Sequence, residues 1–294
     1  MSLRVATRGS RLARIQAARV VELLDEPADL VIVSSTGDQR PDVPIHQIGG
    51  TGVFVKEVED AVLDGRADIA VHSAKDLPSE TAPGLLLAAV PERGDPRDAL
   101  VGLPLDAVPT GGRIGTGSVR RRAQLAAARP DLAFGELRGN IETRIEKAAG
   151  FDAVVIAVAA LDRLGRRADA AEVLESDVLL PQVAQGALAV ECRAGDASVI
   201  ERLAAIDDTR AHAEVTAERA YLATLGGGCA LPCGALARAN AGGEVSLEAL
   251  LASGDGRMVL RASGRGIDPE VLGLDVAHRL LDDHGGRLLL EQVA

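Results

Sequence analysis

One local pattern occurs twice in this chain of 294 residues and constrains its fold more than any other feature. A short apolar segment ends in a polar turn that contains glycine, and a serine then precedes an amphipathic segment. The first turn is Thr7-Arg8-Gly9-Ser10 and the second is Gly115-Thr116-Gly117-Ser118. Each copy predicts a strand, a tight turn and a helix whose first backbone N–H groups are capped by the serine hydroxyl. Alternating strands and helices of this kind predict two doubly wound α/β domains that face each other across a cleft.

Arginines gather around the second turn, although the chain has a formal net charge of −11. Between Gly115 and Arg144 they are Arg120, Arg121, Arg122, Arg129, Arg138 and Arg144. A second apolar segment at 132–137 leads into Arg138 and the next helix. Because strand ends of an open sheet share one edge, we expect the two basic turns to converge. Guanidinium groups beside a helix N-terminus bind anions, so the pattern favours an anion site. A helix with a solvated basic face is the alternative interpretation.

The remainder of the first domain follows the same pattern. Leu12, Ile15 and Leu23 form the expected apolar stripe of its first helix, and Leu30–Val33 is expected to be a second buried strand. Residues 39–50 are expected to form a surface loop, and Asp68–Val71 a third strand.

Lys75 and Asp76 follow that third strand, and Pro78 prevents a helix from continuing there. Both side chains are therefore presented at a strand end, beside the arginine turns. An ordinary exposed ion pair and a chemical role both remain open for them.

The order of the segments predicts three domains. Residues 85–97 read as a crossing strand and a hinge, and residues 182–191 read as a buried strand that returns to the first domain. Domain 1 would comprise residues 1–92 and 184–206, domain 2 residues 97–181, and domain 3 residues 208–294. In domain 3 a helix from Asp208 to Leu225 precedes alternating segments at 235–239, 244–253 and 257–264 and a helix near 269–283. That order is typical of a small α+β domain with an antiparallel sheet.

Cys229 lies in the loop GGGCALPCG, where three preceding glycines leave its thiol sterically open for covalent attachment of a bulky group. Zinc is disfavoured because Cys229 and Cys233 lack a second pair of ligands, and we expect no metal. A buried thiol is the other alternative. We read Cys192 as a small core residue, and we assign no role to Cys233.

The composition argues against several classes of protein. No apolar segment approaches the length of a membrane span, and the N-terminal segment lacks a signal-peptide pattern, so we expect a cytoplasmic protein that binds no membrane. We also expect a monomer, although the sequence itself does not determine the oligomeric state. A nucleic-acid binder is disfavoured by the net charge and by one tyrosine without tryptophan. A two-lobed solute-binding protein for a carboxylated ligand is a further alternative, which the loop at Cys229 and the lack of a signal peptide disfavour.

Several motifs, taken in order, resemble the porphobilinogen deaminase family, also called hydroxymethylbilane synthase. From Arg4 to about Gly264 they are ATRGS, GVFVKE, ADIAVHSAKDLP, DPRDA, GTGSVRRRAQL, LRGNIETR, VAQGALAVEC and the GGGC loop. The resemblance implies two periplasmic-binding-protein-like domains and a third that holds one dipyrromethane cofactor through a thioether to Cys229. It implies an enzyme that joins four porphobilinogen units head to tail, releases ammonia each time and hydrolyses the linear product from the cofactor.

The resemblance also implies roles for individual residues. Asp76 matches the catalytic carboxylate. Cofactor-binding positions, besides Cys229 and Asp76, are Ser73, Lys75, Thr116, Ser118, Arg120, Arg121, Arg144 and Gln185. Substrate-binding positions are Arg8, Ser10, Arg138 and Arg163. The chain departs from the family where Thr51 and Gln47 replace frequent lysines, and the effect of both replacements stays open.

Overall fold

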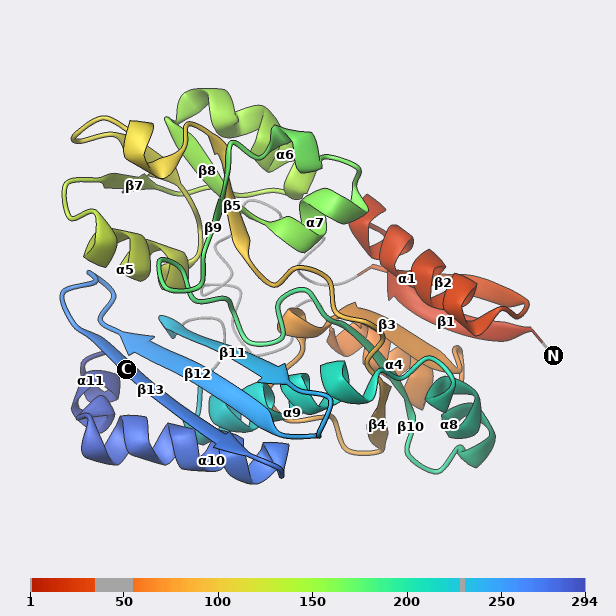
Figure 1. Cartoon of the computed structure of the whole chain (residues 1–294). Helices are drawn as coiled ribbons and strands as arrows, with labels where there is room; N and C mark the ends of the chain where they lie inside the picture. Colours follow the sequence, from red (N-terminus) through yellow and green to blue (C-terminus); the bar gives the residue numbers. More distant parts are fainter. Residues whose placement is uncertain (1, 35–54, 228–230, 294) are drawn as a thin grey trace.

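A computed structural model describes residues 2–34, 55–227 and 231–293. Its strands form two mixed five-stranded sheets and one antiparallel three-stranded sheet, and Figure 1 shows the three sheets in separate parts of the molecule. The fold class predicted from the sequence is therefore confirmed: two α/β sheets are accompanied by a small antiparallel sheet with helices.

The first sheet has the strand order β2-β1-β3-β10-β4. Its strands are β1 (Leu3–Arg8), β2 (Ala28–Val33), β3 (Ile69–Ser73), β4 (Leu85–Ala89) and β10 (Leu188–Arg193). β1 runs parallel to β2 and β3, whereas β10 runs antiparallel to β3 and β4. The accompanying helices are α1 (Arg11–Leu24), α4 (Lys56–Leu63) and α8 (Ala197–Ala204).

The second sheet has the order β7-β6-β8-β5-β9 and repeats the topology of the first. Its strands are β5 (Asp98–Gly102), β6 (Arg113–Gly115), β7 (Ala133–Gly135), β8 (Ala153–Ala157) and β9 (Glu172–Leu174). Here β5, which follows the chain crossing, is the antiparallel strand. The helices are α5 (Val119–Ala128), α6 (Ile141–Glu146) and α7 (Val158–Arg163). In each sheet, the strand that follows a crossing between the sheets, β10 in the first and β5 in the second, is thus the antiparallel one.

The third sheet contains β11 (Cys233–Ala239), β12 (Val245–Ala252) and β13 (Val259–Gly266), all antiparallel. Helices α9 (Thr209–Thr224), α10 (Pro269–His278) and α11 (Gly286–Val293) accompany it, and a π-helical turn at Arg279–Asp283 follows α10. Tyr221 of α9 is fully buried and donates its hydroxyl to the Leu250 carbonyl at 2.8 Å. Close packing of α10 on α9 requires Gly273, since a Cβ there would lie 2.4 Å from the Ala217 carbonyl oxygen.

Two crossing segments join the first two sheets. Gly94 N donates to Gly186 O at 3.2 Å, and Gly186 adopts φ +92°. A Cβ at Gly186 would lie 2.4 Å from Gly94 O, so glycine is required for the two segments to approach. Arg93 ties this crossing to α9, because it donates to Gln185 O at 3.0 Å and to Glu218 Oε1 at 2.7 Å.

Short 3-10 helical turns also occur between these elements, at Ala74–Asp76, Leu105–Ala107, Lys147–Gly150 and Arg167–Asp169. Within the described residues, none of the helices has both the length and the apolar character needed to cross a bilayer.

Three local predictions are wrong. The buried positions of α1 are Ala13, Gln16, Ala17 and Val20, while Leu23 is exposed, because small side chains allow the helix to lie close to the sheet. β2 is an edge strand that leaves Leu30 and Ile32 exposed. The strand expected from residue 182 begins only at Leu188, and residues before it form turns.

Candidate active site

Two serine caps build the polar turns as the sequence predicts, and an asparagine cap is added to them. Ser10 Oγ accepts a hydrogen bond from Ala13 N at 3.3 Å, and Ser118 Oγ accepts one from Arg121 N at 3.4 Å. Asn140 caps α6 in the same way. Thr116 Oγ1 accepts from Ser118 N at 3.2 Å, so this buried threonine shapes the second turn.

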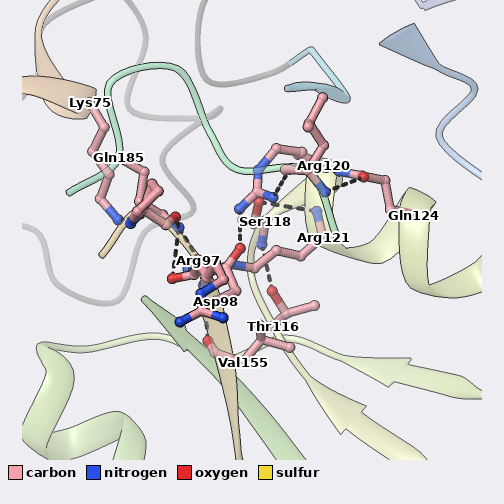
Figure 2. Close-up of polar contacts among 12 residues, drawn as sticks. Lys75, Arg97, Asp98, Thr116, Ser118, Arg120, Arg121, Gln124, Val155 and Gln185 are labelled. Atoms are coloured by element: carbon pink, nitrogen blue, oxygen red, sulfur yellow. Dashed lines mark hydrogen bonds and ion pairs between the residues drawn. The ribbon is translucent and has the colours of Figure 1, made fainter. Parts of the chain in front are cut away.

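Arg120 and Arg121 are buried and share one carboxylate, that of Asp98 at the start of β5 (Figure 2). Arg120 Nη2 donates to Asp98 Oδ2 at 2.7 Å, and Arg121 Nη2 donates to Asp98 Oδ1 at 2.6 Å. The remaining contacts are to backbone: Arg120 Nη1 donates to Leu180 O at 2.6 Å and Arg121 Nη1 to Val155 O at 2.9 Å. Their two positive charges hold the pKa of the buried Asp98 carboxyl below its usual range despite the opposing effect of burial. The anion site predicted here therefore already contains one internal anion.

Lys75 reaches across to the same carboxylate through Gln185. Lys75 Nζ donates to Gln185 Oε1 at 3.1 Å, and Gln185 Nε2 donates to Asp98 Oδ1 at 2.9 Å and to Pro96 O at 2.7 Å. Figure 2 shows these side chains pointing toward one another. Burial and the nearby Arg121 charge lower the pKa of Lys75 to about 8. The exposed Lys75–Asp76 ion pair considered above is absent from the described residues, since Lys75 turns to Gln185 instead.

Arg144 and Arg163 are also held by backbone. Arg144 Nε donates to Gly139 O at 2.9 Å, and Arg163 Nη2 donates to Gly186 O at 2.6 Å. Burial lowers the pKa of each guanidinium to about 10, and the charges of Arg121 and Arg138 add to the effect at Arg144. In the part of the chain that the structure describes, no carboxylate lies within ion-pair distance of either group.

Asp76 lines a small pocket at the ends of β1 and β3. Arg8, Gln16, His72 and Ser73 line it as well. Ser73 Oγ and Gln16 Nε2 lie 2.8 Å apart and hydrogen-bond, which joins α1 to the end of β3. Asp76 also acts on the cations of the site, because its charge opposes the lowering of the pKa of Lys75 and of Arg144.

Three predicted positions lie outside the described residues: Cys229, Thr51 and Gln47. The structure thus brings together Lys75, Asp76, Arg120, Arg121, Arg144 and Gln185, and places Arg8 and Ser73 in the adjoining pocket with Asp76. Among the described residues, no group of three His, Cys, Asp or Glu side chains could hold a metal ion.

Comparison with known proteins decides the family. The family model "Porphobilinogen deaminase, dipyromethane cofactor binding domain" matches residues 3–201, and "Porphobilinogen deaminase, C-terminal domain" matches residues 212–282. A porphobilinogen deaminase of Roseiflexus castenholzii is 48% identical over 299 residues, covering 98% of each chain. One of Brevibacillus brevis is 41% identical over 298 residues, covering 98% of this chain and 96% of the other.

The chain belongs to the porphobilinogen deaminase family. Membership makes it a transferase of porphyrin and heme biosynthesis that uses a dipyrromethane cofactor. The observed site fits such a group. Acetate and propionate side chains require cationic partners, and Arg144 and Arg163 are partly buried cations that lack a carboxylate partner among the described residues.

Asp98 and Gln16 are site residues that sequence reasoning missed. Asp98 stands in the motif DPRDA, and it is the one charged residue in the otherwise apolar strand Asp98–Gly102. A lone carboxylate at the start of an apolar strand was the signal that could have identified Asp98 as a site residue. Gln16 has no comparable signal, because its partner Ser73 is remote in the sequence.

Proposed function

We propose that this chain performs its family's reaction at the site described above. It condenses four porphobilinogen molecules head to tail, with loss of ammonia, and releases hydroxymethylbilane by hydrolysis. The observation that carries the proposal is that Lys75 hydrogen-bonds through Gln185 and Asp98 to Arg120 and Arg121, while its neighbour Asp76 lines a pocket with Arg8. The acidic group thus lies close to several cations that suit a ligand rich in carboxylates.

The cations would bind the ligand's carboxylates. Lys75, Arg120, Arg121 and Arg144 would hold the cofactor, with hydroxyl or amide groups of Ser73, Thr116, Ser118 and Gln185. Arg8, Ser10, Arg138 and Arg163 would hold the incoming substrate. Arginine suits these positions because its planar guanidinium donates two parallel hydrogen bonds to one carboxylate.

Asp76 would be the catalytic carboxylate. Loss of ammonia from porphobilinogen leaves a cationic methylene-pyrrole, and an ionised carboxylate beside it stabilises that charge. Asp76 can also accept hydrogen bonds from the pyrrole N–H groups and transfer protons during the step. The cofactor, when bound, supplies the primer to which the new units are added.

Further assignments belong to the same proposal. Cys229 would carry the dipyrromethane through a thioether. Residues 1–92 with 184–206, 97–181 and 208–294 would be the three domains, and the protein would act as a cytoplasmic monomer.

Denaturing mass spectrometry of the full chain tests the attachment. Cys229→Ser should lose both the covalent adduct and porphobilinogen consumption, while Cys233→Ser, a change at the second cysteine of the same loop region, should retain the adduct. An active Cys229→Ser protein without an adduct would contradict the assignment.

Asp76→Asn tests the catalytic role. The variant should keep its adduct but lose turnover by a factor of about 100 to 1000, because an amide cannot stabilise the developing positive charge. Near-normal turnover would remove Asp76 from this role.

A further inference from the structure

A chain of polar contacts, buried from Gln185 onward, connects Lys75, at the end of the first sheet, to the arginine pair of the second. It runs from Lys75 Nζ to Gln185 Oε1 at 3.1 Å, from Gln185 Nε2 to Asp98 Oδ1 at 2.9 Å, and from Asp98 to Arg120 and Arg121 at 2.7 and 2.6 Å. Gln185 lies in a crossing segment between the sheets, and Asp98 opens β5 directly after the other crossing segment. All links appear together in Figure 2.

The direction of the hydrogen bonds in this chain is fixed. Lysine can only donate and carboxylate can only accept, so Gln185 must turn its oxygen to Lys75 and its amide nitrogen to Asp98. The backbone acceptor Pro96 O, 2.7 Å from Gln185 Nε2, enforces the same orientation. Asp98 and Gln185 are themselves fully buried, which strengthens each link relative to water.

The chain also sets the charge of the site. Two guanidinium groups and one carboxylate leave the arginine pair with one net positive charge rather than two. Asp98 further opposes the lowering of the pKa of Lys75, whereas both arginines promote it.

We propose that Asp98, acting through Gln185, is a positioning residue that holds Lys75 and the Arg120–Arg121 pair in one arrangement for the ligand's carboxylates. This rests on the proposed function of the same cations. A purely structural role, in which Asp98 only fastens α5 to β5, is the competing explanation. Only the positioning role predicts that a change at Asp98 alters Lys75, because Lys75 belongs to neither α5 nor β5.

Lysine chemistry offers a test that does not depend on activity. The chain has only three lysines, Lys56, Lys75 and Lys147, so competitive acetylation with acetic anhydride followed by peptide mass spectrometry reports each one against pH. The charged groups that face Lys75 are Asp76, Asp98, Arg120 and Arg121. The measurement is made on the full chain and repeated in the Cys229→Ser background, where no attached carboxylates contribute.

Asp98→Asn should move the half-labelling pH of Lys75 downward by about one unit, because it removes a nearby negative charge. Lys56 and Lys147 should keep their values, and the alkaline limb of the turnover profile should shift in the same direction as Lys75. Asp68→Asn is the matched control, since Asp68 also lies between two arginines, Arg4 at 2.6 Å and Arg193 at 3.6 Å, but makes no contact with this chain. It should leave Lys75 unchanged.

Gln185→Leu keeps the test informative if Asp98→Asn fails to fold. This variant retains the Asp98–arginine contacts but removes the acceptor of Lys75, so its half-labelling pH should also fall. An unchanged Lys75 in a folded Asp98→Asn or Gln185→Leu protein would overturn the proposal. If Cys229 is not the attachment site, the mass of the adduct would show it, and the lysine labelling would be unaffected.

Discussion

Two pairs of arginines, one buried and one partly buried, differ in how their charge is compensated. Arg120 and Arg121 share the carboxylate of Asp98. Arg144 and Arg163 donate to backbone carbonyls, and within the described residues no carboxylate is paired with them. Burial lowers the pKa of each of these two guanidinium groups to about 10, and it also lowers the pKa of Arg120.

The difference lies in whether the protein itself supplies a counter-ion, as it does for Arg120 and Arg121, or the ligand would have to supply it. A buried charge without a counter-ion costs folding free energy, and a protein retains one where it serves a function. We therefore expect the fold to depend on the contacts of Arg120 and Arg121 with Asp98, and we expect it not to depend on Arg144 and Arg163. The comparison leads to four predictions.

Arg121→Met should give the largest effect on folding. Removing one guanidinium leaves the buried Asp98 carboxylate partly unpaired, which costs about 3–5 kcal/mol of unfolding free energy. Urea denaturation measures it, and Arg122→Met is the control because Arg122 is the exposed neighbour on the same helix. A loss below about 1 kcal/mol would mean that the ion pair does not support the fold.

Lys75 should make stability depend on pH, because its pKa is about 8 in the folded protein against an ordinary 10.5. Between these values the unfolded chain binds a proton that the folded protein does not, so unfolding free energy rises with pH across this window. Lys75→Met in the Cys229→Ser background should therefore be more stable at pH 7 by at most about 3 kcal/mol, and the difference should vanish near pH 10.5. Turnover should fall as pH rises through about 8, where Lys75 loses the charge that binds carboxylate. A constant difference between the two proteins across pH 7–11 would contradict the burial of this charge.

Arg144→Met should reverse the pattern seen for Arg121. Its unfolding free energy should be unchanged or higher, while turnover falls by about 10–100-fold through loss of a charged hydrogen bond worth about 1.5–3 kcal/mol. Parallel denaturation and porphobilinogen-consumption assays check both, again with Arg122→Met as control. A destabilised but fully active variant would place Arg144 with the structural set.

The two serine caps should give the smallest effects. Ser10→Ala and Ser118→Ala should each lose about 1 kcal/mol, because both hydroxyls cap a helix N-terminus. Ser118→Asp should restore the cap but lower turnover, since its charge would repel the ligand's carboxylates. Equal turnover for Ser118→Asp and the unmodified protein would remove Ser118 from the ligand site.

Local signals made much of this fold predictable. Each serine cap and each glycine turn is encoded within a few residues, and the same pattern located Lys75 and Asp76 at a strand end. Even the third sheet followed from alternation between Gly-containing turns, with β11 to β13 close to the predicted segments. Helix α11 and the π-helical turn were not predicted.

Long-range placement was not predictable in the same way. Leu30 and Ile32 looked like core residues, and only the strand order places them on an edge. The exposure of Leu23 has a similar origin, since the sheet selects the alanine face of α1. Asp98 is separated by 87 residues from Gln185, so no local pattern joins them.

The position of β10 has a consequence for synthesis of the chain. β10 lies between β3 and β4, so the first sheet stays divided until Leu188–Arg193 has left the ribosome. Translation proceeds at about 5–20 residues per second, so several seconds pass between synthesis of β4 and synthesis of β10. During this time the edges of β3 and β4 that later pair with β10 stay exposed. Those edges are where self-association during translation is expected to begin, and early capture of that segment by a chaperone would protect it.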